Sequence, residues 1–160
     1  MRRTVGIAAG IVGAVVIAAV AQGCGSSTAP MAKAYVSAMS PANESPPKTT
    51  TGTGITTFVD NGSQIDWTMS LTGMTGVFAS HIHLGAAGVP GPVIFNLFVP
   101  NGTNTSTLNG VVGSGTITNA NNVNISLDSL RVLFNNGNAY VNVHTTANPG
   151  GEIRAQISPK

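Results

Sequence analysis

Charged residues are scarce in this sequence of 160 residues, in which Asp, Glu, Lys and Arg make up 8% and aromatic residues 5%. So little charge excludes the strongly charged, solvated composition that is typical of disordered chains. Leu and Lys are also few, whereas Gly occurs 20 times, and this balance argues against a bundle of helices. At this length we expect one small domain that is rich in strands and turns.

The formal net charge of +2 comes entirely from Arg2 and Arg3 at the N-terminus. In the rest of the chain, basic and acidic residues balance. A basic excess confined to an N-terminal leader does not form the basic face of a nucleic-acid-binding domain. We therefore expect no nucleic-acid partner.

Residues 1–23 have the pattern of a secretory signal peptide. Arg2 and Arg3 precede an uncharged apolar run, Val5 to Val20, which is shorter than the roughly 20 residues that span a bilayer. An uncleaved membrane anchor is the alternative interpretation of this run. Both interpretations place residues 33–160 outside the cytoplasm, because the positive end of such a segment stays inside.

Two cleavage sites compete at the end of the leader. Ala21-Gln-Gly-Cys24 resembles a bacterial lipobox, whereas Ala19-Val-Ala21 fits an ordinary signal peptidase. Cys24 is the only cysteine, and a lone thiol has no disulfide partner in an oxidising compartment. Lipidation explains it better, so we expect a lipoprotein in which Cys24 carries the lipid, residues 24–32 form a flexible tether, and residues 33–158 form an extracytoplasmic domain.

Apolar and polar residues alternate in short segments separated by turn dipeptides, a pattern typical of β-sandwiches. The clearest hairpin joins Gly54–Asp60 to Gln64–Leu71 through Asn61-Gly62. Further strands are expected at Ala34–Met39, Val77–Leu84, Val93–Val99, Gly110–Ile117, Ala139–Thr145 and Glu152–Ser158. The expected core includes Ile65, Trp67, Met69, Val141, Val143, Ile153 and Ile157.

One segment departs from the strand period. Leu127, Leu130 and Phe134 recur at helical spacing, with Ser126 placed to cap the first turn and Gly137 placed to end the helix. This pattern predicts one short helix, from Leu127 to about Asn135, lying over an open side of the sandwich.

Several segments together resemble the CHRD domain family, named for repeats in chordin and also found in bacterial secreted proteins and lipoproteins. They are Glu44-Ser-Pro-Pro47 with Gly52 and Gly54, His81-Ile-His83 followed by Gly85 and Gly91-Pro-Val93, and Tyr140-Val-Asn-Val-His144 running into Asn148-Pro-Gly-Gly-Glu-Ile-Arg154. The resemblance covers about residues 33–158. It implies an extracytoplasmic antiparallel β-sandwich of the immunoglobulin-like or superoxide-dismutase-like kind, and it implies no enzymatic activity.

Three histidines are placed by the strand period on polar faces. His81 and His83 leave the same face of one strand, and His144 leaves the polar face of another, where Glu152 is expected nearly opposite it. A His-x-His pair with a third histidine from a neighbouring strand suits Zn²⁺ or Cu²⁺, with a carboxylate or water as fourth ligand. The candidate metal ligands are therefore His81, His83, His144 and Glu152.

The alternative is that these histidines are ordinary polar residues, hydrogen-bonded to Tyr140, Asn142 or loop carbonyls. Copper/zinc superoxide dismutases also carry His-x-His on a β-sandwich, but they need more histidines and a zinc-site aspartate. No Gly-x-Ser-x-Gly elbow supports a hydrolase. Two functions remain: a membrane-anchored, non-catalytic binding or structural module that contacts a protein or envelope component, or a periplasmic metal-binding protein.

Overall fold

The structure is a computed structural model that describes residues 32–102, 105–121 and 125–160. The expected signal peptide, Cys24 and all of the tether except residue 32 lie outside these ranges. Among the residues that are described, no helix is long and apolar enough to cross a membrane.

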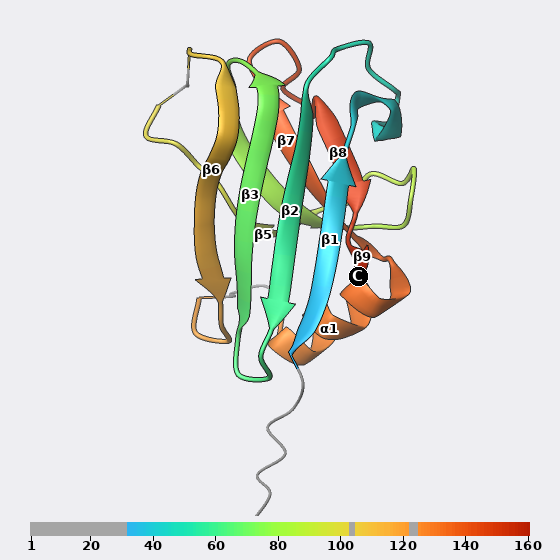
Figure 1. Cartoon of the computed structure of the whole chain (residues 1–160). Coiled ribbons are helices and arrows are strands. Elements are labelled where there is room, and N and C mark those ends of the chain that lie inside the picture. Colours follow the sequence, from blue (N-terminus) through green and yellow to red (C-terminus); the bar gives the residue numbers. More distant parts are fainter. Residues whose placement is uncertain (1–31, 103–104, 122–124) are drawn as a thin grey trace, which may run out of the picture.

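Two antiparallel sheets pack face to face (Figure 1). One sheet has the strand order β6-β3-β2-β1-β9, and the other has the order β5-β4-β7-β8. The elements are β1 (Lys33–Met39), η1 (Pro41–Asn43), β2 (Thr53–Asp60), β3 (Ile65–Met74), β4 (Val77–Leu84), β5 (Val93–Asn96), β6 (Leu108–Ile117), α1 (Leu127–Asn136), β7 (Ala139–Thr145), β8 (Ile153–Gln156) and β9 (Ser158–Pro159). This arrangement confirms the expected antiparallel β-sandwich with one short helix.

Two expected strands end earlier than the sequence pattern indicated. The strand expected to reach Val99 ends at Asn96, because Leu97 and Phe98 both bond to Ser80 and so interrupt the regular ladder with β4. The last expected strand is divided in two at Ile157, whose N–H donates to Ala139. The chain then leaves one sheet and pairs as β9 with β1 of the other, a crossover that a local pattern does not encode.

The hairpin between β2 and β3 forms at Asn61-Gly62 as expected. Gly62 has a φ of 92°, which a residue with a Cβ rarely adopts. The Asp60 carboxylate accepts a hydrogen bond from the Gly62 N–H at 2.9 Å, and the Asn61 side chain accepts others from the backbone of Ser63 and Gln64. Side chains at the turn thus accept hydrogen bonds from backbone N–H groups that the turn leaves without a strand partner.

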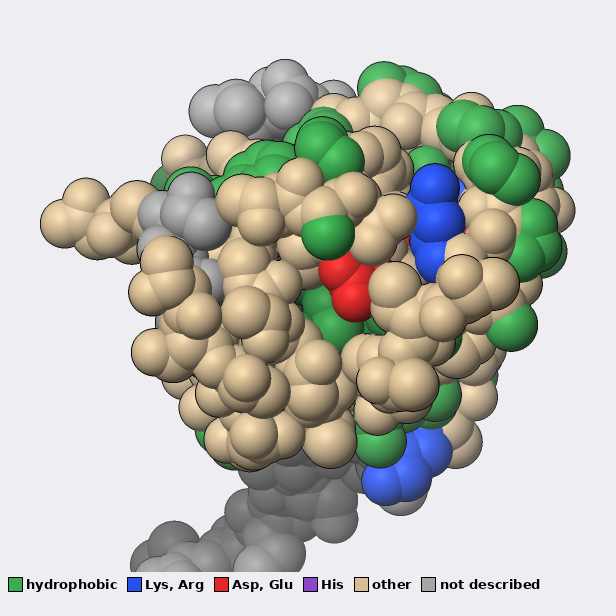
Figure 2. Space-filling view, turned by 90° about the horizontal axis from the view of Figure 1, so that it is seen from above, with side chains coloured by type: hydrophobic (Ala, Val, Ile, Leu, Met, Phe, Trp, Pro, Cys, Tyr) green, Lys and Arg blue, Asp and Glu red, His purple; other side chains and the backbone are tan. Residues whose placement is uncertain are grey.

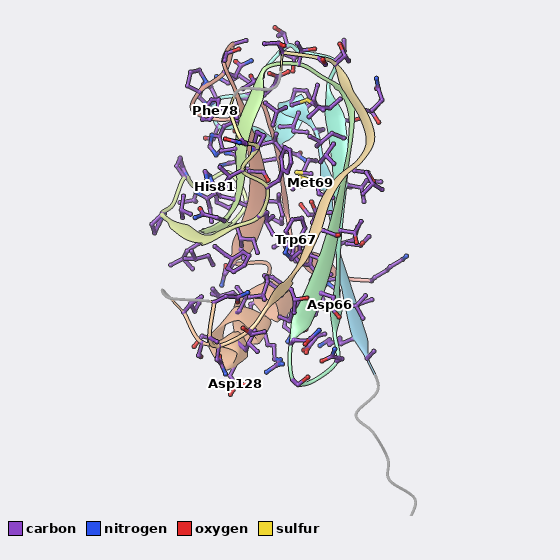
Figure 3. The ribbon with its side chains drawn as sticks, turned by 90° about the vertical axis from the view of Figure 1, so that its left-hand side faces the viewer. Asp66, Trp67, Met69, Phe78, His81 and Asp128 are labelled. Carbon is purple, nitrogen blue, oxygen red and sulfur yellow. The ribbon has the colours of Figure 1, made fainter. Side chains whose placement is uncertain are left out.

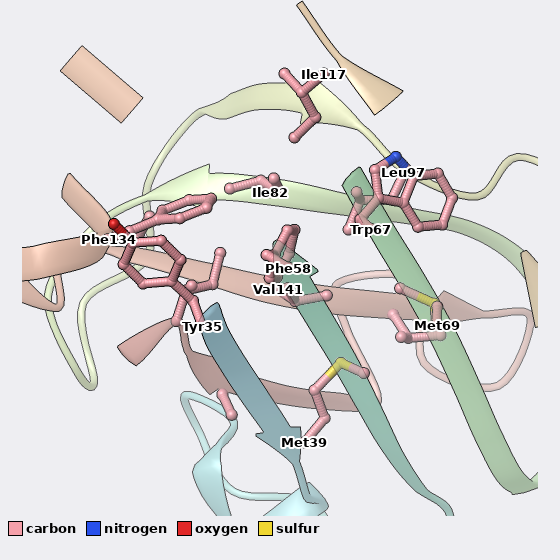
Figure 4. Close-up of a cluster of buried hydrophobic side chains, with 14 of the residues drawn as sticks. Tyr35, Met39, Phe58, Trp67, Met69, Ile82, Leu97, Ile117, Phe134 and Val141 are labelled. Carbon is pink, nitrogen blue, oxygen red and sulfur yellow. The ribbon is translucent and has the colours of Figure 1, made fainter. Parts of the chain in front are cut away.

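The core lies between the two sheets (Figure 4). All seven residues expected there are buried: Ile65, Trp67, Met69, Val141, Val143, Ile153 and Ile157. Helix α1 closes one end of this core, where the Phe134 ring lies 5.2 Å from Tyr35 and 5.1 Å from Phe58, centroid to centroid. The helix therefore completes the core rather than merely covering it.

Helix α1 begins and ends where its sequence predicts. The Ser126 hydroxyl accepts a hydrogen bond from the Ser129 N–H at 3.2 Å, and Gly137 ends the helix in the left-handed conformation with a φ of 64°. Leu127, Leu130 and Phe134 form its buried face. The structure thus confirms the helix that the spacing of these three residues predicted.

Candidate metal centre

The three histidines lie on the outer face of the sheet that contains β4 and β7. In the antiparallel register, His81 faces Asn142, His83 faces Tyr140, and Ala79 faces His144. Figure 3 shows His81 on the outside of this sheet, away from Trp67 and Met69, which lie between the sheets. No histidine is visible from the end opposite α1, where an acidic side chain lies in a hollow (Figure 2). That end of the sandwich therefore presents no histidine.

The three imidazole rings form a compact cluster. The ring centroid of His81 lies 4.9 Å from that of His144 and 5.7 Å from that of His83, and His83 lies 5.7 Å from His144. One nitrogen from each ring lies within 4.8 Å of the other two. His83 and His144 are each only 8% exposed. The structure thus brings together the three histidines that the strand period placed on polar faces.

Backbone carbonyls orient two of the rings. Nδ1 of His83 lies 2.9 Å from the Gly91 oxygen, and Nδ1 of His144 lies 3.0 Å from the Pro149 oxygen. A carbonyl oxygen only accepts, so each Nδ1 carries the proton and each Nε2 keeps its lone pair. These two Nε2 atoms and Nδ1 of His81 are buried without a hydrogen-bond partner. Metal-ligating histidines have this arrangement, with one nitrogen donating to a carbonyl and the other free.

Tyr140 supports the His83 ring from the next strand. The two rings are stacked 5.0 Å apart with an angle of 11° between their planes, and the Tyr140 hydroxyl accepts a hydrogen bond from the Gly91 N–H at 3.1 Å. Gly91 therefore contacts both residues through its backbone. A Cβ at this position would lie 1.6 Å from the Leu84 oxygen, so only glycine fits there.

Burial keeps the cluster uncharged. Desolvation, reinforced by the neighbouring His144 and His83, lowers the pKa of His81 to about 4. Burial is also the main reason that the pKa of His83 and the pKa of His144 are lowered. At neutral pH the three rings are therefore neutral, which is the form that binds a metal ion.

Glu152 does not join the cluster, although the sequence placed it nearly opposite His144. Its carboxylate accepts hydrogen bonds from the Thr145 hydroxyl and from the Asn148 amide and so holds the turn between β7 and β8. Thr145 shares the core-facing side of β7 with Val143, so Glu152 turns away from the histidines. Among the residues described, no carboxylate or thiol lies in the group with the three rings.

The sequence alternative of hydrogen bonds to loop carbonyls is met at His83 and His144, but the sequence did not indicate which loop residues supply them. Gly91 and Pro149 act through backbone carbonyls, and no residue type signals that role. Their proximity to His83 and His144 depends on where two loops fold. Within the described part of the chain, Arg154 also makes no hydrogen bond to the rings: its Nε donates to the Asn43 oxygen at 2.7 Å.

Comparison with known proteins identifies the family of this chain. The model of the CHRD domain matches residues 35–157, which run from β1 to the residue before β9. No curated protein and no solved structure gives a significant match. The match includes all three histidines and the loops that orient them. The chain belongs to the CHRD domain family.

Proposed function

We propose that this protein binds a divalent transition-metal ion, Zn²⁺ or Cu²⁺, through His81, His83 and His144. One observation carries the proposal: three clustered imidazoles each keep one buried ring nitrogen without a hydrogen-bond partner, while carbonyls fix the opposite nitrogen of two of the rings. Histidines with a purely structural role would pair their second nitrogen as well, because a buried unpaired polar atom costs about 1–3 kcal/mol. Coordination to a metal ion removes that cost.

The coordination chemistry fits both ions. Imidazole ligands suit zinc and copper, and ligands bonded to Zn²⁺ at 2.0–2.1 Å in a tetrahedron lie about 3.4 Å apart. The nitrogens of the cluster lie within 4.8 Å of one another, so the rings must approach one another to coordinate a single ion. With Glu152 turned away, the fourth position is left for water or an external ligand.

Metal titration tests this function directly. We expect the chelator-treated protein to bind one Zn²⁺ or Cu²⁺ ion per chain in calorimetry at pH 7. His83→Ala and His144→Ala should each weaken binding at least 100-fold. Glu152→Gln is the matched control and should bind as the unaltered protein does. Absence of binding, or tight binding that survives both histidine substitutions, would overturn the proposal.

We further propose that the domain is a binding module held outside the cytoplasm by a lipid on Cys24 and facing a protein or envelope component. The support is the position of the only cysteine, directly after a short apolar run. Mass spectrometry of membrane-extracted protein should find a lipid-modified N-terminal Cys24, and Cys24→Ser should release the protein or stall its processing. An unmodified N-terminus at Gln22 would contradict the anchor.

A further inference from the structure

A second group of buried polar side chains lies beside the histidines, at the β8 side of the same sheet face. Glu44, directly after η1, is 6% exposed, and Arg154 on β8 is 3% exposed. Both line a cavity of about 430 Å³. Its other walls come from Ala42 and Asn43, from Ala87 and Gly88 of the β4–β5 loop, and from Ala155 and Gln156 of β8.

Burial raises the pKa of Glu44 and the charge of Arg154 offsets part of that rise, but the two groups are not in direct contact. No ion pair joins Glu44 to Arg154 within 4.0 Å among the described residues. One carboxylate oxygen of Glu44 and Nη2 of Arg154 are buried without a hydrogen-bond partner, although Arg154 is held by the Asn43 carbonyl and lies 4.8 Å from the Tyr140 ring centroid. Burying opposite charges without direct contact is unfavourable unless another group bridges them.

We propose that this cavity binds a small zwitterion, namely a free α-amino acid. The guanidinium of Arg154 offers a fork of donors that matches a carboxylate, and the Glu44 carboxylate offers an acceptor for an ammonium group. The small apolar walls at Ala42, Ala87 and Gly88 leave room for a side chain. A simple anion in the cavity would meet the charge of Glu44, and a simple cation would meet that of Arg154, so neither alone fits as well.

This site is distinct from the metal centre. Asn142 separates the two, because it pairs with His81 on one side and with Arg154 on the other. The proposal therefore does not depend on metal binding, and it is tested in the presence of a chelator. The chelator also prevents an amino acid from reaching the protein as a metal complex.

The experiment titrates glycine and L-alanine into the ¹⁵N-labelled protein and follows the amide and side-chain resonances. Acetate and ethylamine, which carry only one of the two charges, are titrated in parallel. We expect the amino acids to shift the signals of Glu44 and Arg154 and to bind at least tenfold more tightly than either single-charge compound. Acetate binding as tightly as glycine, or no shift at millimolar concentration, would overturn the proposal.

Two variants test whether the charges of Glu44 and Arg154 bind the amino acid. Glu44→Gln keeps the shape of the side chain, and Arg154→Lys keeps the charge but loses the fork. Each should weaken glycine binding at least tenfold. Glu152→Gln makes the same chemical change at another buried glutamate and should leave binding unaltered. Should Arg154→Lys fail to fold by circular dichroism, Glu44→Gln decides alone, and wild-type affinity in that variant would refute the site.

Discussion

Each imidazole has two nitrogen atoms, and in His83 and His144 the backbone decides which of them is free. The carbonyls of Gly91 and Pro149 take the Nδ1 protons, so both Nε2 lone pairs are left without a partner. Burial then lowers the pKa of each ring and keeps it neutral. Two ordinary effects, a hydrogen bond and desolvation, thus prepare these side chains for metal binding.

The stability of the metal-free protein should fall as the pH drops from 6.5 towards 4. The His81 pKa is 6.5 in the unfolded chain and about 4 in the folded chain, so in this window the unfolded state binds more protons. Urea unfolding between pH 7.5 and 4 should show the loss, and it should be smaller in His81→Asn. Burial raises the pKa of Glu44, which acts in the opposite direction. Because both proteins keep Glu44, their difference reports His81 together with its coupling to His144 and His83, and parallel profiles would contradict the prediction.

Among residues that are not metal ligands, Gly91 is the one whose substitution should most specifically weaken metal binding. Gly91→Ala would force a Cβ against the Leu84 oxygen, which lies 1.6 Å from the position it needs. The loop must then move, and with it the carbonyl that orients His83. We expect metal affinity to fall about 10- to 100-fold, as is usual when a ligand loses its supporting hydrogen bond. Calorimetry should show no such change in Val89→Ala, which alters an exposed side chain of the same loop.

At the scale of secondary-structure elements, one arginine ties α1 to the β2–β3 hairpin. The Arg131 guanidinium donates two hydrogen bonds to the Asp60 carboxylate, at 2.8 and 2.9 Å, and a third to the Gly62 oxygen. The hydrogen bonds from Arg131 also hold the pKa of Asp60 below its ordinary value. The position of the helix therefore depends on this contact as well as on its apolar face.

Arg131→Gln should destabilise the protein by about 1.5–3 kcal/mol, the usual loss for hydrogen bonds to a charged group. Asp128 also accepts from Arg131, but its side chain is 92% exposed. Asp128→Asn is therefore expected to change stability by less than about 1 kcal/mol. Chemical unfolding of both variants checks the contrast. Equal effects would show that the buried contact with Asp60 contributes nothing beyond an exposed ion pair.

For the whole molecule, the buried apolar residues form one cluster between the two sheets. The core holds side chains from β1, β2 and β3 against those from β4, β7 and β8, and α1 closes one end. The polar outer face of the second sheet depends on this packing, because the core face of each strand sets the direction of the alternate residues. The metal centre is thus a consequence of where the core lies.

Val141→Ala should destabilise the protein by about 1 to 2 kcal/mol, at the low end of the cost of shortening a buried side chain. Val141 is fully buried, whereas Val111 on β6 is 69% exposed. Val111→Ala makes the same chemical change at the surface and should cost less than about 0.5 kcal/mol. Thermal or urea unfolding measures both. Equal losses would argue against the core described here.

Local patterns determined the fold class and most elements. Alternation of apolar and polar residues located β4 and β7 to the residue, since each strand has one apolar face and one polar face. Helical spacing, Ser126 and Gly137 located α1, because caps act over a few residues. The same alternation placed His81, His83 and His144 on polar faces. All of these are properties of neighbours along the chain.

Tertiary structure decided the rest. That β4 and β7 are adjacent, and hence that the three histidines meet, depends on pairing between segments about sixty residues apart. The same holds for the carbonyls of Gly91 and Pro149, for the turn of Glu152 towards Thr145, and for the cavity that Glu44 and Arg154 share. An alternating strand pattern predicts towards which face of the sheet a side chain points. Only the packing of loops and sheets determines which groups contact that side chain.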